Sequence, residues 1–179
     1  MTKYLVLATG LTGSGKGTFS KYMETELDFY RACPEEIRDE IYGSEHISDY
    51  GKRVAAKAHA TDVTLERVRT KLGEGRNVVI DSGAPTNKRR HELLDEFDNE
   101  DYKKCILIFQ ADTETRIQRV QKRPGYGKRL SLDMVEKIVR DDVSNWEEPD
   151  IEGVEIIRYI NETQEDIAVI QNGLSEQFG

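Results

Sequence analysis

The stretch GLTGSGKGT (residues 10–18) decides the fold of this chain. It follows a nearly continuous apolar run, KYLVLAT (3–9), and leads into a helical pattern over residues 15–26. A run of this kind is typical of a strand buried on both faces of a parallel sheet. The stretch is therefore interpreted as a glycine-rich turn that joins a buried strand to a helix, the context in which the pattern G-x-x-x-x-G-K carries chemical meaning.

The turn itself predicts a cradle for phosphate groups. Its glycines let the backbone curl so that successive N–H groups point inward, and the N-terminus of the following helix adds further donors. Lys16 supplies a mobile positive charge that can reach terminal phosphates. An ordinary tight turn with a surface lysine is the alternative, which the complete pattern disfavours. The predicted nucleotide-binding residues in this stretch are Gly10, Thr12, Gly13, Ser14, Gly15, Lys16, Gly17 and Thr18.

One position of the turn departs from the common motif and bears on metal binding. Gly17 stands where that motif has a Ser or Thr hydroxyl for Mg²⁺, and Thr18 follows it. Asp81 ends the apolar run NVVID (77–81), at the edge of the sheet where the cradle lies, and suits a contact to Mg²⁺ or its waters. Thr18 and Asp81 are the predicted metal contacts. A strand-terminal Asp that begins a turn is the alternative for Asp81.

Strand and helix patterns alternate along the whole chain, which predicts an α/β fold with a five-stranded parallel sheet and helices on both faces. The expected strands cover residues 3–9, 29–33, 77–81, 105–111 and 154–160. The expected helices cover residues 15–26, 34–43, 50–73, 86–97, 113–123, 131–146 and 163–177. No linker or repeat interrupts residues 1–179, so a single domain is expected.

Composition narrows the class of protein further. The formal net charge of −8 repels polyanions at long range, which counts against non-specific nucleic-acid binding but leaves room for a local basic site. The two cysteines have no metal-ligand spacing and are expected as buried, reduced residues in strands. No apolar stretch is long enough for a membrane span or signal peptide, and a cytoplasmic location is expected.

A pair of charged residues that follows the second strand predicts the acceptor side of a phosphoryl-transfer site. Glu35 and Arg38 lie three positions apart at the start of a helix and share one face. Glu35 would accept a proton from a hydroxyl, and Arg38 would hold an acceptor anion. The alternative is that Glu35 complements the helix dipole while Arg38 is an ordinary surface side chain.

Two basic clusters stand out in this acidic chain. Residues 116–130 contain Arg116, Arg119, Lys122, Arg123, Lys128 and Arg129. Their helical spacing, followed by Pro-Gly-Tyr-Gly, predicts a short lid that places arginines over a triphosphate. The second run, residues 88–91, opens the helix after Asp81 and is a weaker candidate for acceptor contacts. A solvated basic surface is the alternative for both.

The order of GLTGSGKGT, EEIRDEIYG, NVVIDSGAPTNKRRHELL and TETRIQRVQKRPGYGKR resembles the P-loop kinases related to the kinase domain of phage polynucleotide kinase. The resemblance implies an ATP- and Mg²⁺-dependent kinase in which Glu35 is the base, Arg38 binds the acceptor, and Arg119 and Arg123 act from the lid, with Arg119 also contacting the nucleotide. The chain departs from that family in having Glu35 for Asp, Gly17 for Ser, and no Asn two residues after Asp81.

Three functional hypotheses follow. The preferred one is a kinase that transfers the γ-phosphate of ATP to the 5′-hydroxyl of a nucleic acid or to a nucleotide-like acceptor. The second is a small-molecule kinase acting on a nucleoside, nucleoside monophosphate or other metabolite. The third is an ATPase or nucleotide switch acting on a partner, for which the sequence offers no recognisable switch segment.

Overall fold

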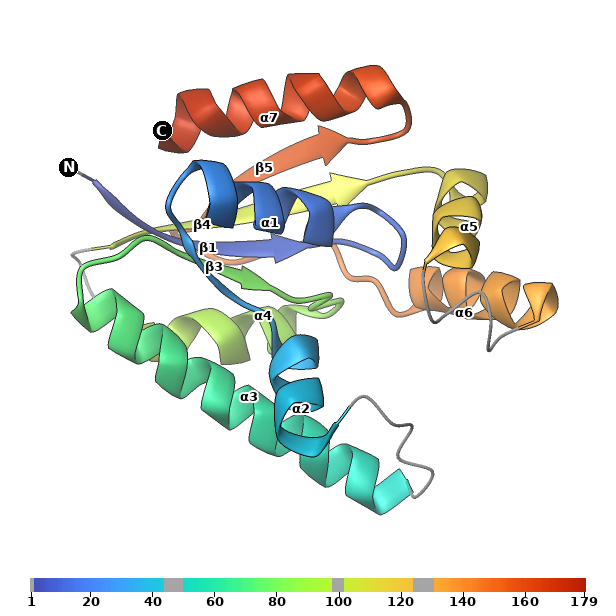
Figure 1. The fold of residues 1–179 in the computed structure, drawn as a ribbon, viewed down its shortest axis with the longest axis horizontal. Coiled ribbons are helices and arrows are strands. Elements are labelled where there is room, and N and C mark those ends of the chain that lie inside the picture. Colours follow the sequence, from blue (N-terminus) through green and yellow to red (C-terminus); the bar gives the residue numbers. More distant parts are fainter. Residues whose placement is uncertain (1, 44–49, 98–101, 124–130) are drawn as a thin grey trace.

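A computed structural model describes residues 2–43, 50–97, 102–123 and 131–179 and confirms the five-stranded parallel sheet. The strands lie in the order β2-β3-β1-β4-β5, and their carboxyl ends meet at one edge (Figure 1). They are β1 (Lys3–Thr9), β2 (Tyr30–Ala32), β3 (Val78–Asp81), β4 (Tyr102–Gln110) and β5 (Glu155–Ile160). β4 begins three residues earlier than predicted, because its polar start pairs with β1 from Lys3 onward.

The predicted helices are present with shifts of one or two residues at most ends. They are α1 (Lys16–Glu26), α2 (Pro34–Tyr42), α3 (Tyr50–Gly73), α4 (Asn87–Leu94), the 3₁₀ turn η1 (Asp95–Phe97), α5 (Thr113–Lys122), α6 (Leu132–Ser144) and α7 (Gln164–Phe178). Two of these helices begin after a capping residue: the hydroxyl of Thr86 accepts from the N–H of Arg89, and that of Ser131 from the N–H of Met134.

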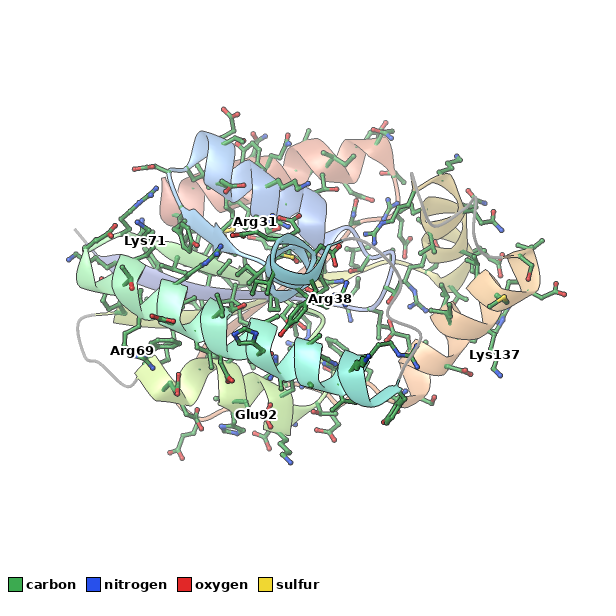
Figure 2. The ribbon with its side chains drawn as sticks, turned by 60° about the horizontal axis from the view of Figure 1, so that its bottom comes forward. Arg31, Arg38, Arg69, Lys71, Glu92 and Lys137 are labelled. Atoms are coloured by element: carbon green, nitrogen blue, oxygen red, sulfur yellow. The ribbon has the colours of Figure 1, made fainter. Side chains whose placement is uncertain are left out.

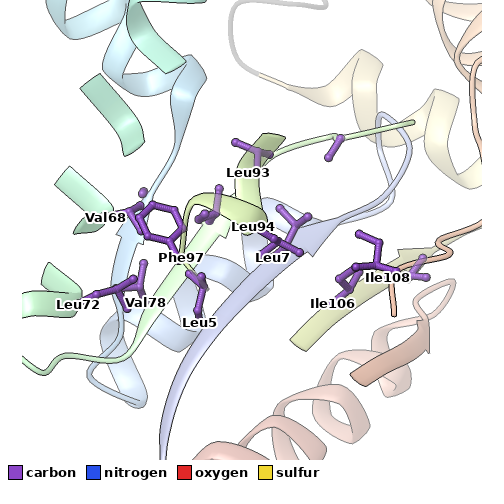
Figure 3. Close-up of a cluster of buried hydrophobic side chains, with 14 residues drawn as sticks. Leu5, Leu7, Val68, Leu72, Val78, Leu93, Leu94, Phe97, Ile106 and Ile108 are labelled. Carbon is purple, nitrogen blue, oxygen red and sulfur yellow. The ribbon is translucent and has the colours of Figure 1, made fainter. Parts of the chain in front are cut away.

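Alternating side chains of each strand enter two separate apolar layers. Leu5 and Leu7 of β1 face α3, α4 and η1, in the layer shown in Figure 3. Val6 and Ala8 face the opposite side, which α1 and α7 cover. Because both faces are buried, the strand needs apolar residues at every position, which explains the continuous run in the sequence.

α5 and α6 lie at the carboxyl edge of the sheet rather than over its faces (Figure 1). They pack on each other through Ile117, Val120, Val135 and Val139. α5 carries the helical part of the predicted lid. Residues 124–130 of that lid, including Lys128 and Arg129, lie outside the described residues.

The two cysteines are buried and unpaired. Cys105 lies in β4 as predicted, whereas Cys33 lies just after β2, at the N-terminus of α2. Burial raises the pKa of each thiol to about 12, so neither is a thiolate at neutral pH. Among the helices of the described ranges, none combines the length and the apolar character that crossing a bilayer requires.

Candidate active site

The turn between β1 and α1 has the geometry of a phosphate-binding loop. Gly13 and Gly15 adopt positive φ angles of 86° and 98°. A Cβ atom on Gly13 would lie 2.6 Å from the carbonyl oxygen of Arg116, and one on Gly15 would lie 2.2 Å from Nδ2 of Asn161. Both positions therefore require glycine for backbone conformation and for space. The resulting curl places the N-terminus of α1 at the carboxyl edge of the sheet, where it favours anions.

Even the smallest substitution at Gly13, which adds one methyl group, should destabilise the protein. Gly13→Ala should lower the free energy of unfolding by about 2 kcal/mol, because a positive φ costs an L-residue about 1–2 kcal/mol and the new methyl would press on the backbone of Arg116. Chemical denaturation measures the effect. Gly73→Ala is the control, since a Cβ there meets nothing within 4 Å, and it should change stability by less than about 1 kcal/mol. Equal stability of the two variants would contradict the close approach at Gly13.

The loop opens onto a pocket that holds Lys16 and Glu35 together. It is lined by Gly10, Leu11, Thr12, Lys16, Glu35, Gly83, Pro85, Asp142 and Trp146. Lys16 comes from the first residue of α1 and Glu35 from the first turn of α2. Glu35 is exposed, so its carboxylate is reachable by a ligand. No ion pair to Lys16 is found among the described residues, which leaves its ammonium for phosphate oxygens.

Arg38 does not line this pocket. Its Nε and Nη2 atoms donate to Oδ1 of Asp39, at 3.1 Å and 2.7 Å, and its side chain is 40% exposed. Figure 2, which looks along α2, labels Arg38 beside that helix. Of the two residues predicted for the acceptor side, the structure therefore places only Glu35 in the pocket.

Asp81 lies beside the loop as expected, but it has a partner that the sequence did not reveal. Its Oδ2 atom accepts from Nη2 of Arg31 at 2.6 Å, from Nε of Arg31 at 3.1 Å and from the hydroxyl of Ser20 at 2.7 Å. Both side chains of the Asp81–Arg31 pair are 5% exposed. Burial alone would lower the pKa of Arg31, but its bonds to Glu36 and Asp81 outweigh burial and raise that pKa, so the guanidinium stays charged.

The residues around Gly17 fit a magnesium ion held largely by phosphates and water. A Cβ on Gly17 would lie 3.5 Å from Oδ2 of Asp81, so a carboxylate stands close to the position where the common motif has a hydroxyl. Within the described residues, the hydrogen bonds to Asp81 all end on Oδ2 and none on Oδ1. Thr18 is exposed on the first turn of α1. Carboxylate and hydroxyl oxygens are ligands that Mg²⁺ accepts.

Arg119 reaches the loop through a residue that the sequence analysis missed. Its Nη1 atom donates to the backbone oxygen of Asn161 at 2.8 Å, and Nδ2 of Asn161 donates to the backbone oxygen of Ser14 at 2.8 Å. Asn161 directly follows β5, and a polar residue at the carboxyl end of a parallel strand was the signal that could have identified it. Arg123 is exposed at the end of α5.

Three residues of the basic run at 88–91 have partners within the protein. Arg90 is fully buried, donates to the backbone oxygens of Pro85 and Glu147, and stacks on Trp146 with a distance of 4.6 Å from Cζ to the ring centroid. Arg89 pairs with Glu92 and His91 with Asp95. Arg90 thus holds α4 against the segment that follows α6, and a contact of residues 88–91 to an acceptor stays a prediction.

Comparisons with known proteins agree with this geometry. Residues 5–143 match a family described as an AAA domain, and the chain belongs to that family. No curated protein matches the chain.

Solved structures share the fold over nearly the full chain. One, a provisionally assigned kinase from Chloroflexus aurantiacus, is 18% identical with a TM-score of 0.74, covering 98% of this chain and 96% of that one. A sugar kinase from Janibacter is 16% identical with a TM-score of 0.64, covering 100% and 96%. A chain of the Pnkp1/Rnl/Hen1 RNA repair complex is 17% identical with a TM-score of 0.56, covering 98% and 76%. At these identities the likeness establishes the P-loop kinase-like fold.

Proposed function

We propose that this chain is an ATP-dependent kinase that transfers the γ-phosphate to an alcohol hydroxyl. The observation that carries the proposal is the pocket in which Lys16 and Glu35 face the phosphate-binding loop together. A loop alone would serve an ATPase or a switch equally well, whereas a carboxylate beside the terminal-phosphate position gives an acceptor hydroxyl a group that orients it. The reaction is assigned to the cytoplasm, where the unpaired cysteines stay reduced.

Each group has a role in the proposed transfer. Lys16 and the amides of the loop hold the β- and γ-phosphates, and Glu35 accepts the proton of the acceptor hydroxyl. The hydroxyl oxygen forms a bond to the γ-phosphorus as the bond from that phosphorus to the β,γ-bridging oxygen breaks, and ADP leaves. Mg²⁺, when bound, neutralises charge on the phosphates, and Asp81 and Thr18 are the residues proposed to contact it or its waters.

Arg119 and Arg123 are proposed to act from α5. Arg119 is already fixed at the loop through Asn161 and suits a contact to the nucleotide. Arg123, at the exposed end of the same helix, would place positive charge near the transferring phosphate.

Two acceptor classes are compatible with this site. The 5′-hydroxyl of a nucleic acid or a nucleotide-like compound is the acceptor that the sequence favours, and the fold shared with the RNA repair complex supports it. A small uncharged polyol is the second candidate. It is favoured by the two carboxylates that line the pocket, Glu35 and Asp142, and by the pairing of Arg38 with Asp39 away from it. The fold shared with the sugar kinase also supports the second candidate.

Transfer of labelled γ-phosphate from ATP tests the proposal. The acceptor panel contains 5′-hydroxyl DNA and RNA oligonucleotides, nucleosides, nucleoside monophosphates, sugars and a water control. Glu35→Gln should lower the transfer rate about 100-fold while ATP still binds, because general-base catalysis is worth about 10²–10⁴-fold. Glu40→Gln, the same change further along α2 at a residue that pairs with Arg67, should stay within twofold. Phosphate released only to water, at a rate that Glu35→Gln leaves unchanged, would overturn the proposal.

A further inference from the structure

A carboxylate of the chain itself occupies a donor of the phosphate-binding loop. Oδ2 of Asp142, from the third turn of α6, accepts from the backbone N–H of Thr12 at 2.6 Å. The two residues are 130 positions apart, so the contact is a feature of the fold and not of a local turn. Backbone donors in such a loop suit phosphate oxygens. In this structure, the anion on the amide of Thr12 is Asp142.

The contact lies in the pocket that the proposed function assigns to the terminal phosphate. Thr12, Asp142, Lys16 and Glu35 line the same pocket. The N-terminus of α1, which follows Gly15, is the natural place for the inner phosphates of a nucleotide. Thr12 lines the pocket together with Glu35, so under the proposed function its amide is a donor for the phosphate nearest to the acceptor. A γ-phosphate and the carboxylate of Asp142 therefore compete for one donor and repel each other.

The guanidinium of Arg116 is a second candidate partner for the carboxylate of Asp142. Arg116, in α5, is 2% exposed, and its Nε and Nη1 atoms have no hydrogen-bond partner among the described residues. Its Nη2 atom makes only two long contacts of 3.4 Å, to the hydroxyl of Thr113 and the backbone oxygen of Val139. A buried guanidinium with unused donors is costly, and a carboxylate that accepts from one of them would offset part of that cost.

Asp142 is close enough for its charge to act on Arg116. Burial lowers the pKa of Arg116, and the negative charges of Asp142 and Asp112 partly oppose that change. α5 and α6 pack side by side at the carboxyl edge of the sheet (Figure 1).

We infer that Asp142 determines how well the site distinguishes a nucleoside triphosphate from a diphosphate, an inference that rests on nucleotide binding as in the proposed function. A γ-phosphate takes the amide of Thr12 and displaces Asp142 to Arg116, whereas a diphosphate leaves Asp142 in place. Arg116 thereby favours the triphosphate, because it stabilises the displaced carboxylate. Neither residue touches the reacting atoms, so both act as specificity and positioning residues.

Calorimetric titration of the full chain with Mg²⁺-AMP-PNP and Mg²⁺-ADP tests the inference. Arg116→Met should weaken AMP-PNP binding about tenfold and change ADP binding by less than twofold. Adding Asp142→Asn to Arg116→Met should restore AMP-PNP binding to the wild-type level or better, because the competitor then lacks its charge. Asp141→Asn, an exposed neighbour on α6, should change neither affinity. If Arg116 mattered only for structure, Arg116→Met would weaken the binding of both nucleotides, and adding Asp142→Asn would not restore it.

A crystal structure of the wild-type chain with AMP-PNP tests the same point without a variant, so the inference is decided even if Arg116→Met does not fold. Asp142 should lie within hydrogen-bonding distance of Arg116 in that complex. Asp142 retained on the amide of Thr12, or equal losses for AMP-PNP in Arg116→Met with and without Asp142→Asn, would overturn the inference and leave the proposed kinase intact. If the wild-type chain binds neither nucleotide, the inference and the proposed function both fail.

Discussion

Replacing Lys16 by alanine should reduce phosphoryl transfer by on the order of 10³-fold and leave the fold intact. Lys16 is the positive side chain in the pocket that also holds Glu35, and no ion pair occupies it in the described part of the chain. Positive charge on a transferring phosphoryl group stabilises the negative charge that spreads over its oxygens, and removing one such group commonly costs 10²–10³-fold or more. Because Lys16 lines the pocket and belongs to neither apolar layer, its loss removes no core packing.

The rate is measured as single-turnover transfer from ATP to the best acceptor of the panel, with thermal unfolding of each variant recorded alongside. Lys21→Ala is the matched control. Lys21 lies further along α1, is 62% exposed and makes one long ion pair of 3.8 Å with Glu36, so its rate should stay within twofold. A Lys16→Ala variant that is folded and transfers phosphate at more than a tenth of the wild-type rate would exclude Lys16 from the transfer step.

The sequence was sufficient for the fold because local patterns and tertiary packing agree along the chain. The strand KYLVLAT is apolar at every position since both faces of β1 are covered, and its bounds were predicted without error. The glycine-rich turn was identified for a similar reason. Gly13 and Gly15 stand at positive φ angles, and a residue with no Cβ at such positions is visible in the sequence.

The site was only partly predictable, because side-chain pairing across the fold leaves little trace in the sequence. Glu35 faces the pocket as expected, but Arg38 turns to its neighbour Asp39. Asp142 lies in the middle of an amphipathic helix, and no local pattern distinguishes it from the exposed Asp141 beside it. Its contact to the loop depends on where α6 packs, which is information that only the assembled fold contains.

The largest effect on stability is expected at Arg31, a residue that the sequence analysis did not select. Arg31→Met should lower the free energy of unfolding by about 3–5 kcal/mol, since it leaves the carboxylate of Asp81 buried without its charged partner. Arg31 also donates from Nη1 to Oε2 of Glu36 at 2.7 Å, but Glu36 is 57% exposed and can turn to water. The cost therefore comes chiefly from Asp81. Guanidinium chloride denaturation followed by circular dichroism measures it.

Two further variants separate the buried charge from the loss of an arginine as such. Arg69→Met breaks the pair with Glu96, whose side chains are 59% and 47% exposed, and should cost no more than about 1 kcal/mol. Arg31 and Arg69 are both labelled in Figure 2. Adding Asp81→Asn to Arg31→Met should recover part of the lost stability, because an amide in place of the carboxylate removes the unpaired charge. If the double variant is less stable than Arg31→Met alone, the guanidinium matters through its packing, and the unpaired charge of Asp81 is not the cause of the lost stability.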